Sequence, residues 1–293
     1  MREFTRDGLV FDVTEVGPPD GEVALLLHGW PQDRTAWTAV ATELAAAGMR
    51  AVAFDQRGYS PRARPQGRAA YRMRELVADV AAAVAATGAE RVHLVGHDWG
   101  GSVAWAFAER HPELLRSLTV LSTPHHRALA AALRHPDQAR KSWYIAAFQL
   151  PWLPEAVLRR RLPAVLRDIG LPEPDVQRYA ARFREPGAAA GGLAWYRALP
   201  LGGDVLPDPR KLLRRKGSRA TPAERSSSSI TVPTTYLWGS RDPALGREAA
   251  EASGRWVSAA YDFVELDAGH WLPETEPHAV AKAVVSQRDQ GKD

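Results

Sequence analysis

Short apolar runs recur through the first 122 residues of the chain, and longer segments of helical character separate them. Continuous apolar runs are typical of strands that are buried on both faces of a sheet, and such strands usually pair in parallel. Helices that connect parallel strands cover both faces of the sheet. The pattern therefore predicts a mostly parallel sheet flanked by helices, with strands at 9–16, 23–28, 50–55, 91–96 and 118–122.

Capping residues mark the helices between these strands, which are expected at 33–47, 71–87 and 100–110. Asp33 is a candidate N-cap for the first helix, because its side chain can accept hydrogen bonds from the first turn. Gly48 and Gly88 follow the first two helices, where glycine commonly ends a helix in the left-handed conformation. These signals support alternating strands and helices.

The strand pattern stops at Pro124 and returns near residue 230. Up to about Ala198 the chain reads as short helices broken by prolines, namely Pro151, Pro154, Pro163, Pro172, Pro174 and Pro186. Beyond it, strands are expected at 234–239 and 263–266, with helices at 244–253 and 273–286. We therefore expect an α/β core of about eight strands over 1–123 and 230–293. A helical cap over 124–229 is inserted into it, with a basic flexible insert near 203–229.

Composition narrows the class of protein. The chain has 293 residues, 45% hydrophobic and 25% charged, which is ordinary for a globular protein. It has no cysteine, which excludes disulfides and thiolate metal sites. The net charge of +4 and the pI of about 9.5 raise the question of nucleic-acid binding. However, the arginines are spread along the chain, and the dense basic segment at 210–219 is typical of a solvated loop.

No hydrophobic run in the chain has the length of a membrane span, and the first residues do not resemble a signal peptide. We expect a cytoplasmic protein that binds neither nucleic acid nor membrane, as a monomer or a homodimer.

The motif GHDWGG at 96–101 carries the strongest chemical signal. It stands where an expected strand passes into an expected helix, and its small residues allow a sharp turn. Such a turn presents the nucleophile of many hydrolases, usually a serine; here the central residue is Asp98. The alternative is that Asp98 only caps the following helix.

Three further motifs follow expected strands. HGWPQ at 28–32 places Trp30 in the loop that, with the residue after the nucleophile, supplies oxyanion-binding amides in this architecture. That second residue is Trp99. GSRDP presents Asp242 and DAGHW presents His270, so the chain order is nucleophile, acid, base. The alternative is that each motif is an ordinary loop.

With these motifs, the chain resembles α/β-hydrolases of the epoxide hydrolase and haloalkane dehalogenase group over nearly its whole length. In that resemblance the helical block is the cap domain. The motif DQRGY at 55–59 is also similar to the group, with Asp55 and Arg57 in structural roles.

An aspartate nucleophile favours one type of reaction. A serine that attacked a saturated carbon would leave an ether, whereas a carboxylate leaves an ester that water can hydrolyse. Asp98 therefore indicates displacement at saturated carbon followed by ester hydrolysis. In this scheme Asp242 orients His270, His270 activates the water, and the Trp30 and Trp99 amides stabilise the oxyanion.

Two cap segments, SWYIAAFQLPWLPE (142–155) and GLAWYRALP (192–200), resemble the tyrosine-bearing segments of epoxide hydrolase caps. The resemblance implies that Tyr144 and Tyr196 polarise the epoxide oxygen; the alternative is that both tyrosines pack in an aromatic core. We expect an apolar substrate pocket next to Trp30 and Trp99. Its lining is expected to include Pro31, Phe148, Gln149, Trp152 and Trp195.

The resemblance thus implies an epoxide hydrolase whose substrates are an apolar small-molecule epoxide and water, with no organic cofactor and no metal. Two alternatives stay open. A haloalkane dehalogenase would use the same aspartate, although related enzymes often carry an asparagine where this chain has Trp30. A catalytically silent binding protein would show damage to the triad or the oxyanion motif, and every expected group is present.

Overall fold

The computed structural model describes residues 1–134, 143–199 and 229–291. Its sheet has eight strands, and the expected runs form seven of them. The bounds are β1 (Glu3–Arg6), β2 (Leu9–Val16), β3 (Val23–Leu27), β4 (Arg50–Phe54), β5 (Val92–His97), β6 (Leu115–Leu121), β7 (Thr234–Gly239) and β8 (Tyr261–Leu266). The strand that the sequence did not single out is β1, which is four residues long and pairs with β2 at one edge.

The strands lie in the order β1-β2-β4-β3-β5-β6-β7-β8. Pairing is parallel from β4 to β8 and antiparallel where β2 meets β1 and β4. Every residue of β3, β5 and β7 is buried, as expected for strands covered on both faces. The predicted fold class, a mostly parallel eight-stranded sheet flanked by helices, is confirmed.

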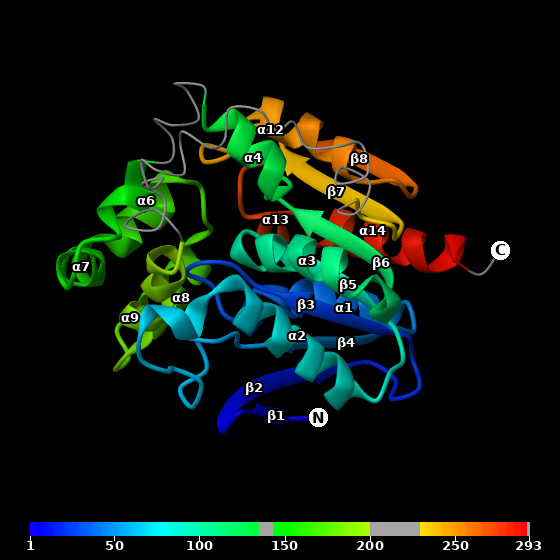
Figure 1. The fold of residues 1–293 in the computed structure, drawn as a ribbon, viewed down its shortest axis with the longest axis horizontal. Coiled ribbons are helices and arrows are strands. Elements are labelled where there is room, and N and C mark those ends of the chain that lie inside the picture. The colour runs from blue at the N-terminus through cyan, green and yellow to red at the C-terminus, as the bar shows by residue number, and fades with distance from the viewer. Residues whose placement is uncertain (135–142, 200–228, 292–293) are drawn as a thin grey trace, which may run out of the picture.

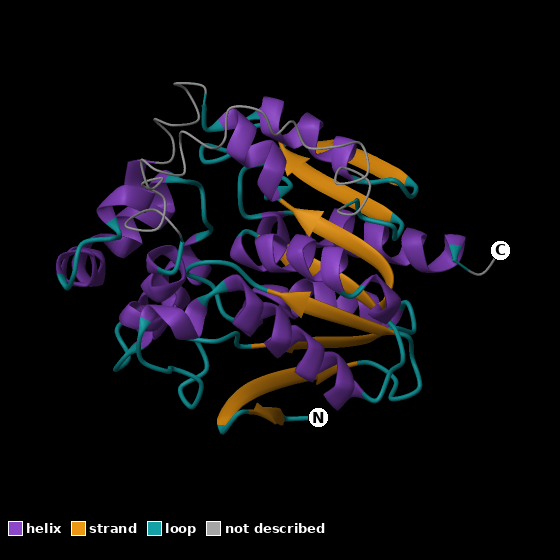
Figure 2. Ribbon diagram, viewed as in Figure 1, coloured by secondary structure: helices purple, strands orange, loops and turns teal. Residues whose placement is uncertain are grey.

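Helices cover both faces of this sheet (Figure 2). Those of the core are α1 (Thr38–Ala46), α2 (Met73–Thr87), α3 (Trp99–Arg110), α12 (Arg247–Ala252), α13 (Leu272–Thr275) and α14 (Pro277–Gln290). Short 3-10 turns are η1 (Arg34–Trp37), η2 (Arg68–Tyr71), η3 (Pro112–Leu114) and η4 (Ser253–Trp256). No helix in the described part of the chain is long and apolar enough to cross a membrane.

The first expected helix begins differently from the prediction. Asp33 does act as an N-cap, since its carboxylate accepts a hydrogen bond from the Thr35 amide at 2.8 Å. The turn that it caps is η1, however, and α1 begins only at Thr38. Short 3-10 turns are frequent at helix ends, and sequence patterns do not distinguish them from a first α-helical turn. Gly88 ends α2 in the left-handed conformation, as expected.

The helical insertion between β6 and β7 contains α4 (His126–Ala132), α6 (Trp143–Ala147), α7 (Leu153–Asp168), α8 (Glu173–Phe183) and α9 (Ala188–Arg197). Helices α6 to α9 gather on the side toward which the strand arrows point, so they lie at the carboxyl ends of the parallel strands (Figure 1). The basic insert expected near 203–229 lies, except for its last residue, outside the described residues.

Pro163 does not break a helix, contrary to the prediction. It lies inside α7, which continues for sixteen residues. An internal proline removes one backbone hydrogen bond and strains the helix. Leu158, Leu162 and Leu166 are buried on both sides of Pro163, so packing of one apolar stripe supports the helix through it.

Candidate active site

Asp98 occupies the sharp turn between β5 and α3. Its backbone has φ 50° and ψ −120°, a conformation that residues with side chains rarely adopt. Glycines make the turn possible: a Cβ on Gly96 would lie 2.4 Å from the Gly100 carbonyl oxygen, and one on Gly100 would lie 2.1 Å from the Leu27 carbonyl oxygen. The backbone of the turn therefore sits directly against the end of β3 and exposes the carboxylate above it.

The loop after β3 holds the Asp98 carboxylate from the other side. The Trp30 amide donates a hydrogen bond to Asp98 Oδ1 at 2.7 Å, and the Trp99 amide also hydrogen bonds to this carboxylate. A Cβ on Gly29 would lie 2.3 Å from the Asp98 Cβ, so only glycine permits this approach. The Trp30–Pro31 peptide bond is cis. The two amides that the sequence suggested for an oxyanion hole thus meet at one carboxylate.

His270 and Asp242 complete a line of three side chains. His270 Nδ1 lies 2.8 Å from Asp242 Oδ2, and His270 Nε2 lies 3.8 Å from Asp98 Oδ2. The other oxygen of Asp242 accepts hydrogen bonds from the Ala244 and Leu245 amides at 2.7 and 3.1 Å. Asp242 is therefore fixed as an acceptor, and it orients the imidazole with Nε2 toward Asp98.

Burial and the neighbouring charges have opposite effects on the pKa values of Asp98 and His270. Burial raises the pKa of Asp98, while the positive charge of His270 and the Trp30 and Trp99 amides work against that rise. Burial lowers the pKa of His270, but the charges of Asp242 and Asp98 outweigh it and raise this pKa to about 9. The raised pKa favours the protonated imidazole of His270 at neutral pH, between the side chains of Asp242 and Asp98.

The cap places two tyrosines over this group. Tyr144 lies on α6 and Tyr196 on α9, and their ring centroids are 6.0 Å apart. The Tyr196 ring packs edge-on against Trp99 at 5.1 Å. Burial and the charge of Asp98 raise the pKa of both hydroxyls, so both carry their protons at neutral pH.

Hydrogen bonds join the two cap segments that carry these tyrosines. Gln149 Nε2 donates to the Tyr196 carbonyl oxygen at 2.7 Å. The Arg197 guanidinium donates to the carbonyl oxygens of Phe148 and Leu150, and it also pairs with Glu155. The spacing of the two tyrosines is therefore built into the cap.

The structure places the other residues that were expected to line the pocket in different positions. Phe148 packs against Trp30 at 5.5 Å, and Pro31 lines a space of about 10 Å³ between the core and the cap. Trp195 is buried behind Trp99 and donates its indole N–H to the Arg57 carbonyl oxygen at 2.7 Å. Trp195 therefore holds the ring of Trp99 in place by packing against it.

The structure does not bring Trp152 to the site. Its side chain is 72% exposed, and it stands as the N-cap of α7 with φ 50°. The aromatic segment 142–155 suggested a shared apolar face, but the chain turns at Pro151 and directs this tryptophan to the surface. Sequence spacing alone does not show on which side of such a turn a side chain falls.

The sequence analysis did not predict a network of hydrogen bonds next to His270. Gln32 Oε1 accepts from the Gly29 amide at 2.7 Å, and Gln32 Nε2 donates to Glu274 at 2.8 Å. The His97 ring lies 2.8 Å from Gln32 Oε1 and 2.9 Å from the His270 carbonyl oxygen. Gln32 and His97 stand inside the two strongest motifs, so their position was a signal for a supporting role.

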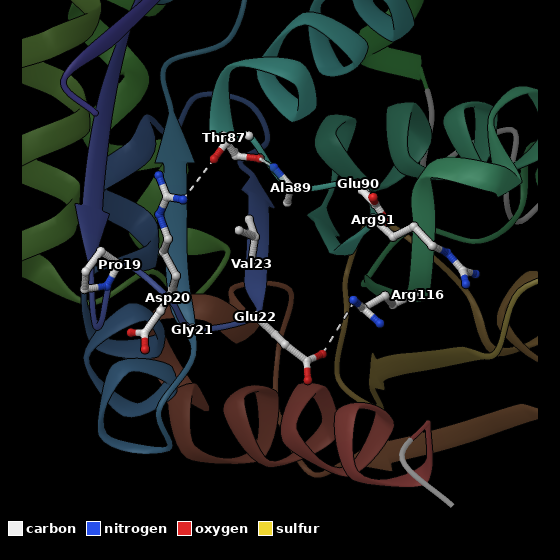
Figure 3. Close-up of a pocket in the computed structure, with 12 residues that line it drawn as sticks. Pro19, Asp20, Gly21, Glu22, Val23, Thr87, Ala89, Glu90, Arg91 and Arg116 are labelled. Atoms are coloured by element: carbon white, nitrogen blue, oxygen red, sulfur yellow. Dashed lines mark hydrogen bonds and ion pairs between the residues drawn. The ribbon is translucent and has the colours of Figure 1, made fainter.

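A second hollow lies at the opposite edge of the sheet. Residues at the amino ends of the strands line a pocket of about 360 Å³, among them Glu22, Arg91 and Arg116 (Figure 3). Arg116 pairs with Glu22 at 3.6 Å, and Arg91 donates to the Leu115 carbonyl oxygen at 2.8 Å. These cations are already engaged, and this edge is far along the strands from Asp98. The candidate active site is the group under the cap.

In chemical terms this group combines a desolvated carboxylate, two amides aimed at it, an oriented imidazole and two protonated phenols. Such an arrangement can attack an electrophilic carbon, protonate a leaving oxygen and direct water at the product.

Comparison with known proteins identifies the family of the chain. A model of the alpha/beta hydrolase fold matches residues 23–170. The chain is 34% identical to the AB hydrolase superfamily protein YfhM of Bacillus subtilis, over 95% of this chain and 94% of that protein. It is 30% identical to Epoxide hydrolase A of Mycobacterium tuberculosis, over 95% and 94%. A product-bound mutant of a Bacillus megaterium epoxide hydrolase superimposes with a TM-score of 0.80, at 26% identity, over 98% of this chain and 99% of that chain.

Proposed function

Because this chain belongs to the epoxide hydrolases of the alpha/beta hydrolase fold family, we propose that it converts an epoxide to a vicinal diol through an ester on Asp98. The observation that carries this proposal is the Asp98 carboxylate, held by the Trp30 amide at 2.7 Å beneath the two cap tyrosines. The proposed substrate is a small apolar epoxide, since aromatic rings surround the carboxylate.

In the first step an Asp98 oxygen attacks one epoxide carbon. A carbon–oxygen ester bond forms while the bond from that carbon to the ring oxygen breaks. The ring oxygen takes a proton from Tyr144 or Tyr196, which leaves a tyrosinate. Both phenols are protonated at neutral pH, and a positioned proton donor contributes about 10²–10⁴-fold to such a step.

In the second step His270 Nε2 removes a proton from water, and the hydroxide attacks the ester carbonyl of Asp98. The Trp30 and Trp99 amides stabilise the oxyanion, each by about 3 kcal/mol. The tetrahedral species releases the diol and restores the carboxylate. The imidazolium of His270 gives its proton to the tyrosinate once the ester has formed, and the proton that His270 then takes from water restores the imidazolium, so epoxide and water are the sole inputs.

Formation of the ester changes His270 from an acid into a base. In the free enzyme the charge of Asp98 helps to raise the pKa of His270 to about 9, so the imidazole is protonated. Esterification removes that charge, and the pKa of His270 falls. The base therefore becomes available only once there is an ester to hydrolyse.

A single turnover in ¹⁸O-water tests this route. With enzyme in excess over styrene oxide, we expect the first diol to carry no solvent oxygen and the peptide containing Asp98 to gain ¹⁸O. This follows because water attacks the ester carbonyl and not the epoxide carbon. Mass spectrometry of the diol and of the peptide measures both.

The matched control is Asp98→Asn, which should leave the peptide unlabelled. Label in the first diol would instead show direct attack of water on the epoxide and would refute the ester.

The same preparation given 1-bromobutane should release no bromide. Release of bromide with epoxides untouched would favour the dehalogenase alternative.

A further inference from the structure

Three potential metal ligands lie together outside the active site. Glu109 is in the last turn of α3, and His125 and His126 lie where the chain leaves β6 to begin α4. Glu109 Oε1 lies 3.4 Å from His125 Nε2 and 3.6 Å from His126 Nε2. The three ligand atoms all lie within 4.8 Å of one another.

The two distances from Glu109 Oε1 fit the spacing of metal ligands better than that of hydrogen bonds. Zinc bonds to imidazole nitrogen and carboxylate oxygen are about 2.0–2.2 Å, so the ligands of a tetrahedral site lie about 3.3–3.5 Å apart. In contrast, an N–H···O hydrogen bond has a mode near 2.9–3.0 Å. The distances from the Glu109 oxygen to the two imidazole nitrogens are thus close to the distance between two ligands of one zinc ion.

Two buried atoms of the cluster lack hydrogen-bond partners. His125 is fully buried, and among the described residues its Nε2 and Glu109 Oε1 face each other at 3.4 Å, which is longer than an ordinary hydrogen bond. Buried polar groups are nearly always paired, so this pair of atoms requires an explanation. A cation between them would satisfy both.

We propose that Glu109, His125 and His126 bind one divalent zinc-like metal ion, with the remaining position open to water. Two imidazoles and one carboxylate are a ligand set that zinc accepts. The site is separate from the reaction, because none of its ligands belongs to the group around Asp98.

Metal binding has a local cost that the site must overcome. The Arg127 amide donates to His125 Nδ1 at 3.3 Å. Coordination of a metal ion by Nε2 places the ring proton on Nδ1, which can then no longer accept this contact. The guanidinium of Arg127 stacks on Trp256 at 4.8 Å and adds nearby positive charge. Both effects predict an affinity below that of dedicated zinc sites.

The position of the ligands indicates a structural role. A metal ion here would clamp the end of α3 to the start of α4, the point at which the chain leaves the sheet for the cap (Figure 1). The same loop already contacts the core, since the His125 amide donates to Ser253 Oγ at 2.9 Å. The ion should therefore raise the thermal stability of the folded chain.

Zinc titration of the full chain, freed of any affinity tag and treated with chelator, tests the proposal. We expect calorimetry to show one zinc ion bound per chain and the melting temperature to rise with zinc. Glu109→Gln and His126→Ala should each weaken binding by at least about 10-fold, since even the loss of groups behind metal ligands costs that much. His126 is half exposed, so its variant should still fold.

The matched control is His278→Ala. His278 forms an exposed pair with Glu43 at 2.9 Å but belongs to a cluster of two groups, so this variant should bind zinc like the parent chain. Equal zinc affinity in the parent, Glu109→Gln and His126→Ala proteins would overturn the proposal, as would the absence of binding to the parent. Loss of binding in His278→Ala alone would place the ion elsewhere and would also overturn it.

Discussion

At the scale of single residues, Asp98 has two proposed effects that one substitution tests together. Its carboxylate is the proposed nucleophile, and its charge helps to raise the pKa of His270 to about 9. Asp98→Asn keeps the shape of the side chain and removes both. We expect kcat for diol formation to fall roughly 10⁴-fold or more, as for other nucleophile substitutions, and the pKa of His270 to fall below about 9. Steady-state kinetics and NMR titration of His270 measure the two.

The stability of the variant should depend on pH in a defined way. A histidine whose folded-state pKa is raised stabilises the fold fully below its ordinary value near 6.5, and that contribution is lost as the pH rises through about 9. The parent chain should therefore lose more stability than Asp98→Asn between these two values. An unchanged pKa of His270 in the variant would contradict the electrostatic account.

The two cap tyrosines make a second prediction at this scale. Tyr196→Phe removes a protonated hydroxyl above Asp98, so we expect ester formation to slow about 10²–10⁴-fold. Ester hydrolysis should change little, because His270 and the Trp30 amide perform it. Rapid-quench measurement of the alkylated enzyme separates the two steps.

Tyr236→Phe is the matched control, since Tyr236 is fully buried in β7 and its hydroxyl has no hydrogen-bond partner in the described part of the chain. An equal slowing in both variants, or none in Tyr196→Phe, would remove the tyrosine from the proposed chemistry. Tyr144→Phe tests whether the second phenol can replace the first.

At the scale of elements, the site depends on the close approach of the β3 loop to the turn at Asp98. Gly29→Ala would place a Cβ 2.3 Å from the Asp98 Cβ, so the loop must move and the Trp30 amide must leave the carboxylate. We expect a loss of about 1–3 kcal/mol of unfolding free energy, typical of overpacking, together with a fall in kcat. Chemical denaturation and kinetics measure these changes.

Gly269→Ala serves as the control for that prediction. It also lies in a loop of the candidate active site, but no atom of the described residues stands within 4 Å of its added Cβ. Its stability should stay close to that of the parent chain. Equal destabilisation by the two substitutions would mean that the close approach to Asp98 is not the cause of the loss at Gly29.

At the scale of the whole molecule, a charged contact joins the cap to the core. Arg182 of α8 pairs at 2.8 Å with Asp55, a fully buried carboxylate that follows β4 and also pairs with Arg34. Arg182→Ala should lower the free energy of unfolding by about 1–3 kcal/mol. This is less than the loss expected when a buried carboxylate loses its last partner, because Arg34 still pairs with Asp55. Hydrogen exchange of α8 should accelerate, since the cap loses an anchor.

The neighbouring Arg184 is exposed at the end of the same helix, so Arg184→Ala is the control. It should leave both stability and exchange unchanged. Unaltered exchange of α8 in Arg182→Ala would show that aromatic packing, and not this ion pair, holds the cap.

Much of the fold was predictable because its signals are local. Buried strands need continuous apolar runs, and helices need caps and terminators, so the strands of the parallel sheet and most helices could be located from their own residues. The triad could be proposed because the carboxyl ends of parallel strands meet at one edge of a sheet, which brings Asp98, Asp242 and His270 together once the topology is known.

Other features were decided by tertiary packing. The direction of Trp152, the continuation of α7 through Pro163 and the network of Gln32, His97 and Glu274 depend on contacts between segments distant in sequence. A one-dimensional pattern records the chemical character of each residue but not the neighbours that folding supplies. The sequence by itself therefore determined the architecture and named the candidate reacting groups, because these depend on local patterns and motifs, while the tertiary structure decided the distances and contacts of those groups.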